Sequence, residues 1–432
     1  MNSTPDLSFE RAIGFAQDLI RIPGAPGAEG DVAARVMREL VALGFHDVRS
    51  DEVGNVIGVA PGTGAAPPVM VCSHMDVVDV GDPASWEHAP YEATIADGHL
   101  HGRGAMDIKG PLALQTYAAA RFLAEPAAGD VVVAHTVLEE RGGWGMAHLM
   151  AKGEVRPGAV IIGESTNGDI CIGHRGRAEI IVELQGLAGH ASAPERARNP
   201  LYGLGRVLDA LQHFAASLTE RDAVLGTASA APTMVETLPG SRNVIPDRAR
   251  VVLDWRVLPG LLPDAALDML REHLHRALGM TDSGAGNAGS AGSAGRRDED
   301  HAIAGAIAGG SLPEGVTLDV RFATEHQHTW TGLADERRLF TPGYLLDADH
   351  AVPRAAAKVV TRATGRAPQL RPWTFATDGG HSCGVHGIPT IGFAPGEERY
   401  AHTNRERLEL ETAQTAYAAY PDLIRAVANA LG

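Results

Sequence analysis

The sequence predicts an α/β fold in which a catalytic domain with a mostly parallel sheet is interrupted by an inserted domain of ferredoxin-like β-α-β-β-α-β order. Three observations predict it. The chain has 432 residues, which is more than one hydrophobic core usually serves. Short apolar runs alternate with helix-like segments up to about residue 175. Beyond that point the order of strands and helices changes.

The first part of the chain alternates helices with buried strands. Residues 8–21 and 30–43 carry apolar side chains at helical spacing. Several later runs are short, apolar and rich in β-branched residues, as in strands that are buried on both faces. A helix at 112–123 between two such runs is typical of the βαβ units of parallel sheets. The expected strands are 47–50, 55–60, 69–72, 131–137 and 159–162.

The middle of the chain predicts the inserted domain. Its expected elements are a strand at 178–185, a helix at 200–218, strands at 232–238 and 248–258, a helix at 264–278 and a strand at 316–324. A Gly/Ala/Ser tract at 283–295 predicts a flexible loop. The expected division is therefore 1–177 for the first part of the catalytic domain, 178–330 for the insertion and 331–432 for the second part. That last part should contain helices at 350–364 and 410–431 and a strand at 390–393.

Composition narrows the class of protein. The net charge of −16 argues against partners such as nucleic acid or an anionic membrane. No apolar run reaches the roughly 20 residues that a membrane span needs. The first 23 residues resemble a polar lead-in and an amphipathic helix rather than a signal peptide. Three cysteines cannot form a disulfide framework, so we expect a cytoplasmic protein.

Five short segments beside these apolar runs contain metal-ligand residue types. They are SHMD at 73–76, GRGAMD at 102–107, LEERGG at 138–143, GEST at 163–166 and AHTNRE at 401–406. Polar chemistry at strand ends across a whole chain indicates an active site that the fold assembles. We therefore expect one two-metal hydrolase site.

His74 and Asp76 stand two residues apart at the end of a strand, so they point to the same side. The Asp76 carboxylate is expected to accept the second ring N–H of His74 and to fix its tautomer for a metal. Alone, such a pair is more often a polar strand end. The other four segments favour the metal site.

Asp107 and the pair Glu139 and Glu140 each have two interpretations. Asp107 in its glycine-rich turn can bridge two cations, or it can cap a helix. Of two adjacent carboxylates, one can bind a metal while the other takes a proton from water, although a solvated strand terminus is common. Glu164 and His402 carry little weight alone, because the chain has 19 histidines.

Together the five ordered segments resemble the M20 metallopeptidase and amidohydrolase family, which includes acetylornithine deacetylase, succinyl-diaminopimelate desuccinylase and glutamate carboxypeptidase. The stretches GDPASW at 81–86, GHRGR at 173–177 and FATDGG at 375–380 resemble its selenium-metabolism-linked hydrolase branch. The resemblance covers nearly the whole chain. It implies a di-zinc aminopeptidase-like catalytic domain with an inserted lid and dimerisation domain.

The resemblance also implies a role for each residue of the site. His74 and Glu164 would hold one metal ion, Glu140 and His402 the other, and Asp107 would bridge the two. Asp76 would support His74, Glu139 would be the general base, and a cis peptide would follow Asp107. Two divalent ions are implied, zinc in the first place with cobalt or manganese as alternatives.

In the inserted domain, the resemblance implies that His190 stabilises the oxyanion and comes from the neighbouring subunit in dimeric members. Asn243, Arg256, Gly379 and Gly380 match substrate-binding positions. An arginine suits a substrate carboxylate, although Arg256 can equally pair with Asp254 on a strand surface.

The expected activity is hydrolysis of the amide bond in a small N-acyl amino acid or dipeptide-like substrate, with a homodimer formed through the lid. A dipeptidase or carboxypeptidase is an alternative to a deacylase. A phosphoesterase and a metal-binding homologue without activity are alternatives from other classes.

Overall fold

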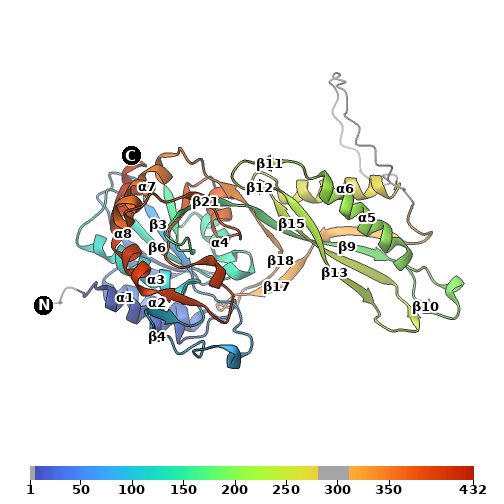
Figure 1. The fold of residues 1–432 in the computed structure, drawn as a ribbon, viewed down its shortest axis with the longest axis horizontal. Coiled ribbons are helices and arrows are strands. Elements are labelled where there is room, and N and C mark those ends of the chain that lie inside the picture. Colours follow the sequence, from blue (N-terminus) through green and yellow to red (C-terminus); the bar gives the residue numbers. More distant parts are fainter. Residues whose placement is uncertain (1–4, 281–310) are drawn as a thin grey trace, which may run out of the picture.

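The computed structural model describes residues 5–280 and 311–432 and shows an elongated molecule made of two units (Figure 1). The Gly/Ala/Ser tract at 283–295 lies outside the described residues. Both ends of the described chain belong to the larger unit, and the smaller unit extends away from it. Within the described ranges, no helix combines the length and the apolar character of a membrane-spanning segment.

The larger unit is built on a nine-stranded mixed sheet. Its order is β1-β2-β6-β3-β7-β22-β8-β20, with β21 paired to β8. The neighbours β6, β3, β7 and β22 run parallel, as the sequence predicts for the buried strands. The strands are β1 His46–Ser50, β2 Val56–Ala60, β3 Val69–His74, β6 Val131–Thr136, β7 Ala159–Ile162, β8 Ile170–His174, β20 Tyr344–Leu345, β21 Leu370–Pro372 and β22 Thr390–Gly392.

Helices cover both faces of this sheet. Alternation along β3 sends Val69 and Val71 to one face and Met70 and Cys72 to the other, and both sets are buried. The first face packs against α1 Phe9–Ile20, α2 Gly30–Leu43, α3 Lys109–Ala120, α7 Ala351–Thr364 and α8 Leu410–Asn429. The second face packs against α4 Trp144–Lys152. A small sheet of β4 Thr94–Ala96, β5 His99–His101 and β23 Arg407–Glu409 flanks the unit.

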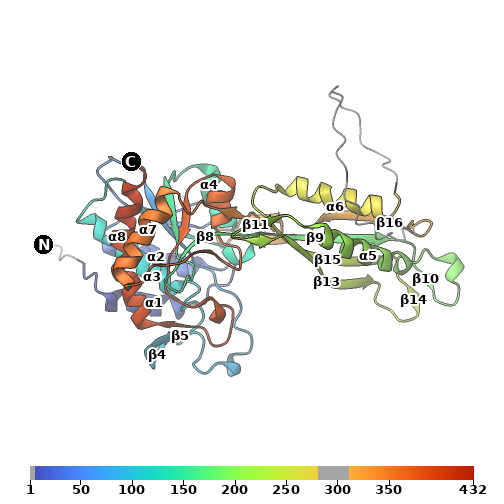
Figure 2. The same ribbon diagram turned by 45° about the horizontal axis from the view of Figure 1, so that its top comes forward.

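The smaller unit has the β-α-β-β-α-β order that the sequence predicts. Its elements are β9 Gly176–Gln185, α5 Leu201–Ser217, β13 Ser229–Leu238, β15 Arg248–Val257, α6 Pro263–Ala277 and β16 Thr317–Phe322. The antiparallel sheet order is β13-β15-β9-β16, with β19 Phe340–Thr341 also on β9. Both helices pack on one face of this sheet (Figure 2) and form a separate hydrophobic core with it.

Three short two-stranded sheets accompany this sheet. Two are hairpins, β11 Arg221–Asp222 with β12 Gly226–Thr227 and β17 Thr324–His328 with β18 Ala334–Arg338, and the third pairs β10 Gly189–His190 with the distant β14 Val244–Ile245. The sequence predicts one strand over 316–324, but the structure ends β16 at Phe322 and begins the β17–β18 hairpin at Thr324. Residue 331 lies in the turn of that hairpin, and pairing with β9 resumes at Phe340. We propose that the inserted unit extends to Thr341.

The β17–β18 hairpin returns to the larger unit and docks on it. The Trp330 indole N–H donates to the Gly54 carbonyl at 3.2 Å, and the Thr331 hydroxyl donates to the Glu52 carbonyl at 2.7 Å. A Cβ on Gly54 would lie 2.1 Å from the Trp330 ring nitrogen, so only glycine permits this contact. The two units are therefore joined by the docked hairpin as well as by the chain connections.

Candidate metal centre

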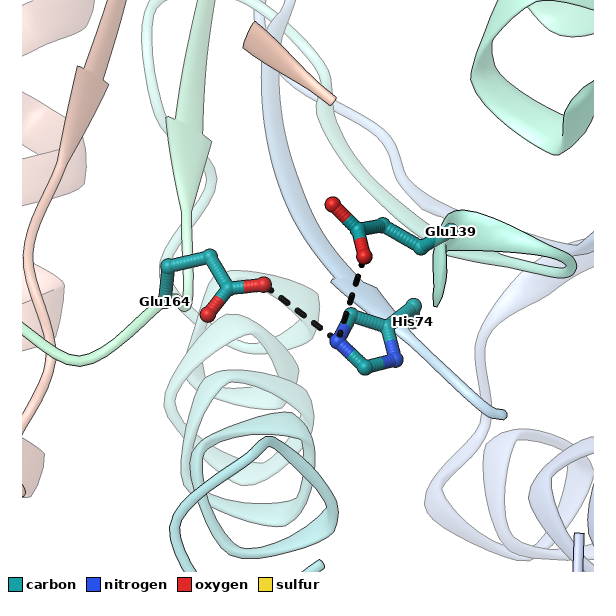
Figure 3. A group of neighbouring side chains, drawn as sticks. All are labelled: His74, Glu139 and Glu164. Atoms are coloured by element: carbon teal, nitrogen blue, oxygen red, sulfur yellow. Dashed lines mark ion pairs between the residues drawn. The ribbon is translucent and has the colours of Figure 1, made fainter. Parts of the chain in front are cut away.

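The candidate site lies at the carboxyl edge of the parallel strands. His74 is the last residue of β3, Glu139 follows β6 by three positions, and Glu164 follows β7 by two. These three side chains point toward one another (Figure 3). The His74 Nε2 atom lies 3.3 Å from a Glu164 oxygen and 4.0 Å from a Glu139 oxygen. The topology thus brings the segments together, as expected for parallel strands.

Asp107 connects His74 to His402. One Asp107 oxygen lies 3.2 Å from His74 Nε2, and the other lies 3.2 Å from His402 Nε2. The His402 Nε2 atom is also 3.1 Å from a Glu140 oxygen. The five residues therefore divide into two groups, one on each side of the Asp107 carboxylate. The Asp107–Ile108 peptide is cis, as the resemblance implies.

The tautomer of His74 suits a metal ligand. Its Nδ1 atom lies 2.8 Å from the main-chain oxygen of Asp76, so Nδ1 carries the hydrogen and Nε2 presents a lone pair. That Nε2 atom is buried and has no hydrogen-bond partner among the described residues. A buried acceptor without a partner is costly unless a cation or donor compensates it.

Asp76 contacts His74 through two groups. Its carboxylate lies 3.5 Å from His74 Nδ1, and its main-chain carbonyl is the closer acceptor, at 2.8 Å. The carboxylate accepts the main-chain N–H groups of Glu139 at 3.2 Å and Glu140 at 3.0 Å. Strand alternation correctly places Asp76 beside His74. It does not reveal that the main-chain N–H groups of Glu139 and Glu140 also donate to the Asp76 carboxylate.

Electrostatics at the site favour bound cations. Burial, followed by the charge of Asp107, raises the pKa of Glu164 to about 7. Burial also raises the pKa of Glu139 well above its usual range. Burial opposes ionisation of Asp107, but the nearby imidazoles of His402 and His74 outweigh it and lower the pKa of this carboxyl group. Several buried carboxylates therefore lie close together, and their negative charges repel one another. Divalent cations relieve this repulsion, so the donor set fits a pair of metal ions.

An open pocket of about 320 Å³ adjoins these residues. Glu139, Glu140 and His402 line it from the larger unit, and Arg177 and Arg256 line it from the first residues of β9 and the last of β15. Arg177 and Arg256 both donate to the Asp254 carboxylate at 2.8 Å. Sequence reasoning missed Arg177, although its register opposite Arg256 follows from the antiparallel pairing of the two strands.

His190 and Asn243 lie together at the other end of the smaller unit. His190 is in β10 and pairs with Val244 of β14, next to Asn243. Both views place β10 at the end farthest from the larger unit, so neither residue joins the metal-ligand cluster of its own chain. The His190 ring is exposed and contacts the Ser192 hydroxyl at 2.6 Å.

Gly379 and Gly380 are buried close to neighbouring chain segments. A Cβ on Gly379 would lie 2.4 Å from the Tyr344 ring, and one on Gly380 would lie 2.0 Å from the Pro342 carbonyl oxygen. Packing thus explains why both positions are glycine. Thr377 of the same loop lines the pocket.

Three further carboxylates that sequence reasoning missed lie behind the site. Glu29 and Asp378 are buried beside it, and Glu406 accepts the main-chain N–H of Asp107 at 3.2 Å. Glu406 is the last residue of the AHTNRE segment, which was the available signal. Glu29 at the start of a helix offers no comparable signal.

The fold, together with the imidazole and carboxylate groups at the edge of its sheet, places the protein in the class of metal-dependent hydrolases of amide bonds. The chain belongs to peptidase family M20/M25/M40, whose family model matches residues 70–426. Membership favours hydrolysis of amide bonds over the phosphoesterase alternative.

Comparisons with individual proteins agree with this assignment. The chain is 29% identical to the protein YgeY of Escherichia coli K12 over 94% of this chain and 93% of that protein. It is 35% identical to the succinyl-diaminopimelate desuccinylase of Methylobacterium sp. strain 4-46, over 64% of this chain and 72% of that enzyme. The fold matches an M20 family metallo-carboxypeptidase of Sulfolobus solfataricus with a TM-score of 0.70 and 16% identity, covering 97% and 99% of the two chains.

Proposed function

We propose that this hydrolase cleaves the amide bond of a small N-acyl amino acid or dipeptide-like substrate that carries a carboxylate. The observation that carries the proposal is the Asp107 carboxylate, whose two oxygens lie 3.2 Å from His74 and from His402. His74 and Glu164 would hold one divalent ion, Glu140 and His402 the second, and Asp107 both. Two such ions, zinc in the first place, would supply Lewis acidity and an activated water.

Glu139 is the proposed general base. It follows the end of β6, lines the pocket, and lies farther from His74 Nε2 than Asp107 or Glu164 does. A carboxylate beside the ligands but outside their inner set can take a proton from the attacking water and deliver it to the leaving amine.

Arg177 and Arg256 are the proposed recognition site for the substrate carboxylate. Both line the pocket that also contains Glu139. The Asp254 carboxylate accepts from both arginines, and Glu179 accepts a further hydrogen bond from Arg177 at 2.9 Å, so these carboxylates orient the two guanidinium groups. A guanidinium presents a planar pair of donors that matches a carboxylate. Deacylase and exopeptidase substrates both carry such a group, and the similarity to a desuccinylase favours the deacylase.

A homodimer through the smaller unit, the lid, is part of the proposal. The outer strand β13 is exposed along most of its length, including Met234 and Val235, and an unpaired edge strand invites pairing with a second copy. His190 is exposed at the far end of the lid, where a partner subunit could present it to the pocket of the first. It would then stabilise the oxyanion.

Two measurements test the proposed chemistry. Glu139→Gln should retain two metal ions per subunit by elemental analysis and lose at least about 100-fold in kcat. Removal of the ions by a chelator should abolish hydrolysis of N-acyl amino acids and dipeptides, and zinc, cobalt or manganese should restore it. Full turnover by Glu139→Gln with its metal content intact would disprove the role of the base.

Mixing two inactive variants tests the shared site. In a hybrid of Glu139→Gln and His190→Ala chains, one of the two sites receives an intact Glu139 and an intact His190. Random exchange should therefore restore about a quarter of the wild-type activity. A mixture as inactive as its components, with hybrid dimers present by native mass spectrometry, would show that His190 does not act across the interface.

A further inference from the structure

The turn that presents Glu139 and Glu140 is held from behind by two buried carboxylates. The main-chain N–H of Leu138 donates to a Glu29 oxygen at 3.1 Å. The next two N–H groups, of Glu139 and Glu140, donate to the two oxygens of Asp76 at 3.2 Å and 3.0 Å. Three consecutive donors are thus taken up by side chains from two distant parts of the sequence.

The conformation of the turn requires such support. Leu138 has a φ of 55°, in the left-handed region that a leucine rarely adopts. Residues held there persist only where the surroundings define the conformation. The bond from Leu138 to Glu29 acts at this strained residue, immediately before the proposed base.

Helix capping does not explain Glu29. The residue occupies the N-cap position of α2, yet its side chain makes no capping hydrogen bond to that helix. The side chain points to the turn instead and is completely buried, and its second oxygen has no hydrogen-bond partner among the described residues. Burying a carboxyl with an unpaired oxygen costs free energy, which argues against a role in stability alone.

We propose that Glu29 is a positioning residue for the general base, because it fixes the Leu138 main chain and thereby the direction of Glu139. This inference rests on the proposed function. Glu29 touches neither the pocket nor the ligand atoms, so it acts through the turn. A misplacement of about 1 Å in a catalytic group can lower the rate about 100-fold.

The experiment compares three variants with a matched control. Glu29→Ala removes the acceptor, Glu29→Asp withdraws it by one methylene, and Glu29→Gln keeps an oxygen for the Leu138 N–H. Glu39→Ala is the control, since Glu39 lies on the same helix but bonds to Tyr117 and Arg35. For each we would measure kcat, KM, metal content per subunit and the thermal midpoint, with Glu139→Gln assayed in parallel.

The expected result is a loss in kcat of about 10–100-fold for Glu29→Ala and Glu29→Asp, with KM within about twofold and two metal ions retained. Glu29→Gln should recover most of the rate, and Glu39→Ala should lose stability without losing kcat. If Glu29→Ala does not fold, Glu29→Asp decides the question.

Wild-type kcat in the folded Glu29 variants would overturn the inference, and so would a loss of rate that matches a loss of metal. Those outcomes leave the proposed function intact as long as Glu139→Gln is inactive. An active Glu139→Gln would instead overturn the proposed function itself.

Discussion

Replacing Glu406 by alanine tests how much this buried side chain stabilises the turn that carries Asp107. The Glu406 carboxylate is buried and accepts a 2.5 Å hydrogen bond from Arg103, which lies 303 positions earlier. Its other oxygen accepts the main-chain N–H groups of Met106 and Asp107, each at 3.2 Å. One side chain therefore joins the C-terminal segment to the turn that carries the proposed bridging ligand.

The cost of the substitution follows from what alanine leaves behind. Arg103 is 2% exposed, and a guanidinium cannot lose its proton, so the variant buries an unpaired charge. Breaking a buried ion pair by removing one partner costs about 3–5 kcal/mol. Each N–H group left without an acceptor adds about 1 kcal/mol. We expect Glu406→Ala to lower the free energy of unfolding by about 5–7 kcal/mol, a large share of the stability of a typical domain.

Urea unfolding of the metal-free protein, followed by circular dichroism, measures this loss without a contribution from metal binding. The double variant with methionine at both Arg103 and Glu406 should cost less than Glu406→Ala, because neither charge is then left alone. Glu398→Ala is the control, since its ion pair with Arg371 is more exposed and should contribute about 1 kcal/mol or less. A loss below about 1 kcal/mol for Glu406→Ala, or a double variant as costly as the two single changes added together, would refute the reasoning.

Two further predictions concern other parts of the fold. Burial lowers the pKa of His174 to about 4, and its ring accepts the Thr377 N–H at 3.0 Å. Below about pH 6.5 this histidine is therefore protonated in the unfolded chain but stays neutral in the folded chain. The free energy of unfolding should decrease by about 1.4 kcal/mol for each pH unit as the pH falls from about 6.5 to about 4. His174→Gln should reduce that slope in urea titrations, and an unchanged slope would contradict the assignment. Trp330→Ala should undock the β17–β18 hairpin and speed amide hydrogen exchange over residues 324–338, whereas Leu333→Ala, at an exposed position in the same turn, should not. Equal exchange in both variants would show that the indole does not anchor the hairpin.

The elements that the sequence predicts best are those whose apolar pattern is strong. The predicted helix at 30–43 and the predicted strand at 159–162 match α2 and β7 at both ends. The β17–β18 hairpin has the sequences TEHQH and ADERR, which lack apolar alternation, and so gives no strand signal. Its strands are defined instead by pairing with each other and by docking of the turn on the larger unit.

The proposed ligands could be predicted because the chemistry of a parallel sheet concentrates at one edge, and each ligand stands close to a strand end or in a short turn. Supporting residues behave differently. Glu29 reaches Leu138 across 109 positions, and Glu406 reaches Asp107 across 299. Bonds of this kind depend on how separate segments pack, and no local spacing encodes them.

The register of the lid sheet explains why its functional residues divide into two sets. β9 begins two residues after β8 of the larger sheet ends, so Arg177 is fixed close to the metal-ligand cluster of its own chain. Pairing of β9 with β15 then places Arg256 opposite Arg177. His190 follows the far end of β9, and a strand of ten residues spans roughly 33 Å. The same strand that brings the arginines to the pocket therefore carries His190 away from it. On this argument, the proposed carboxylate recognition would belong to each subunit alone, whereas the proposed stabilisation of the oxyanion by His190 would require a partner subunit.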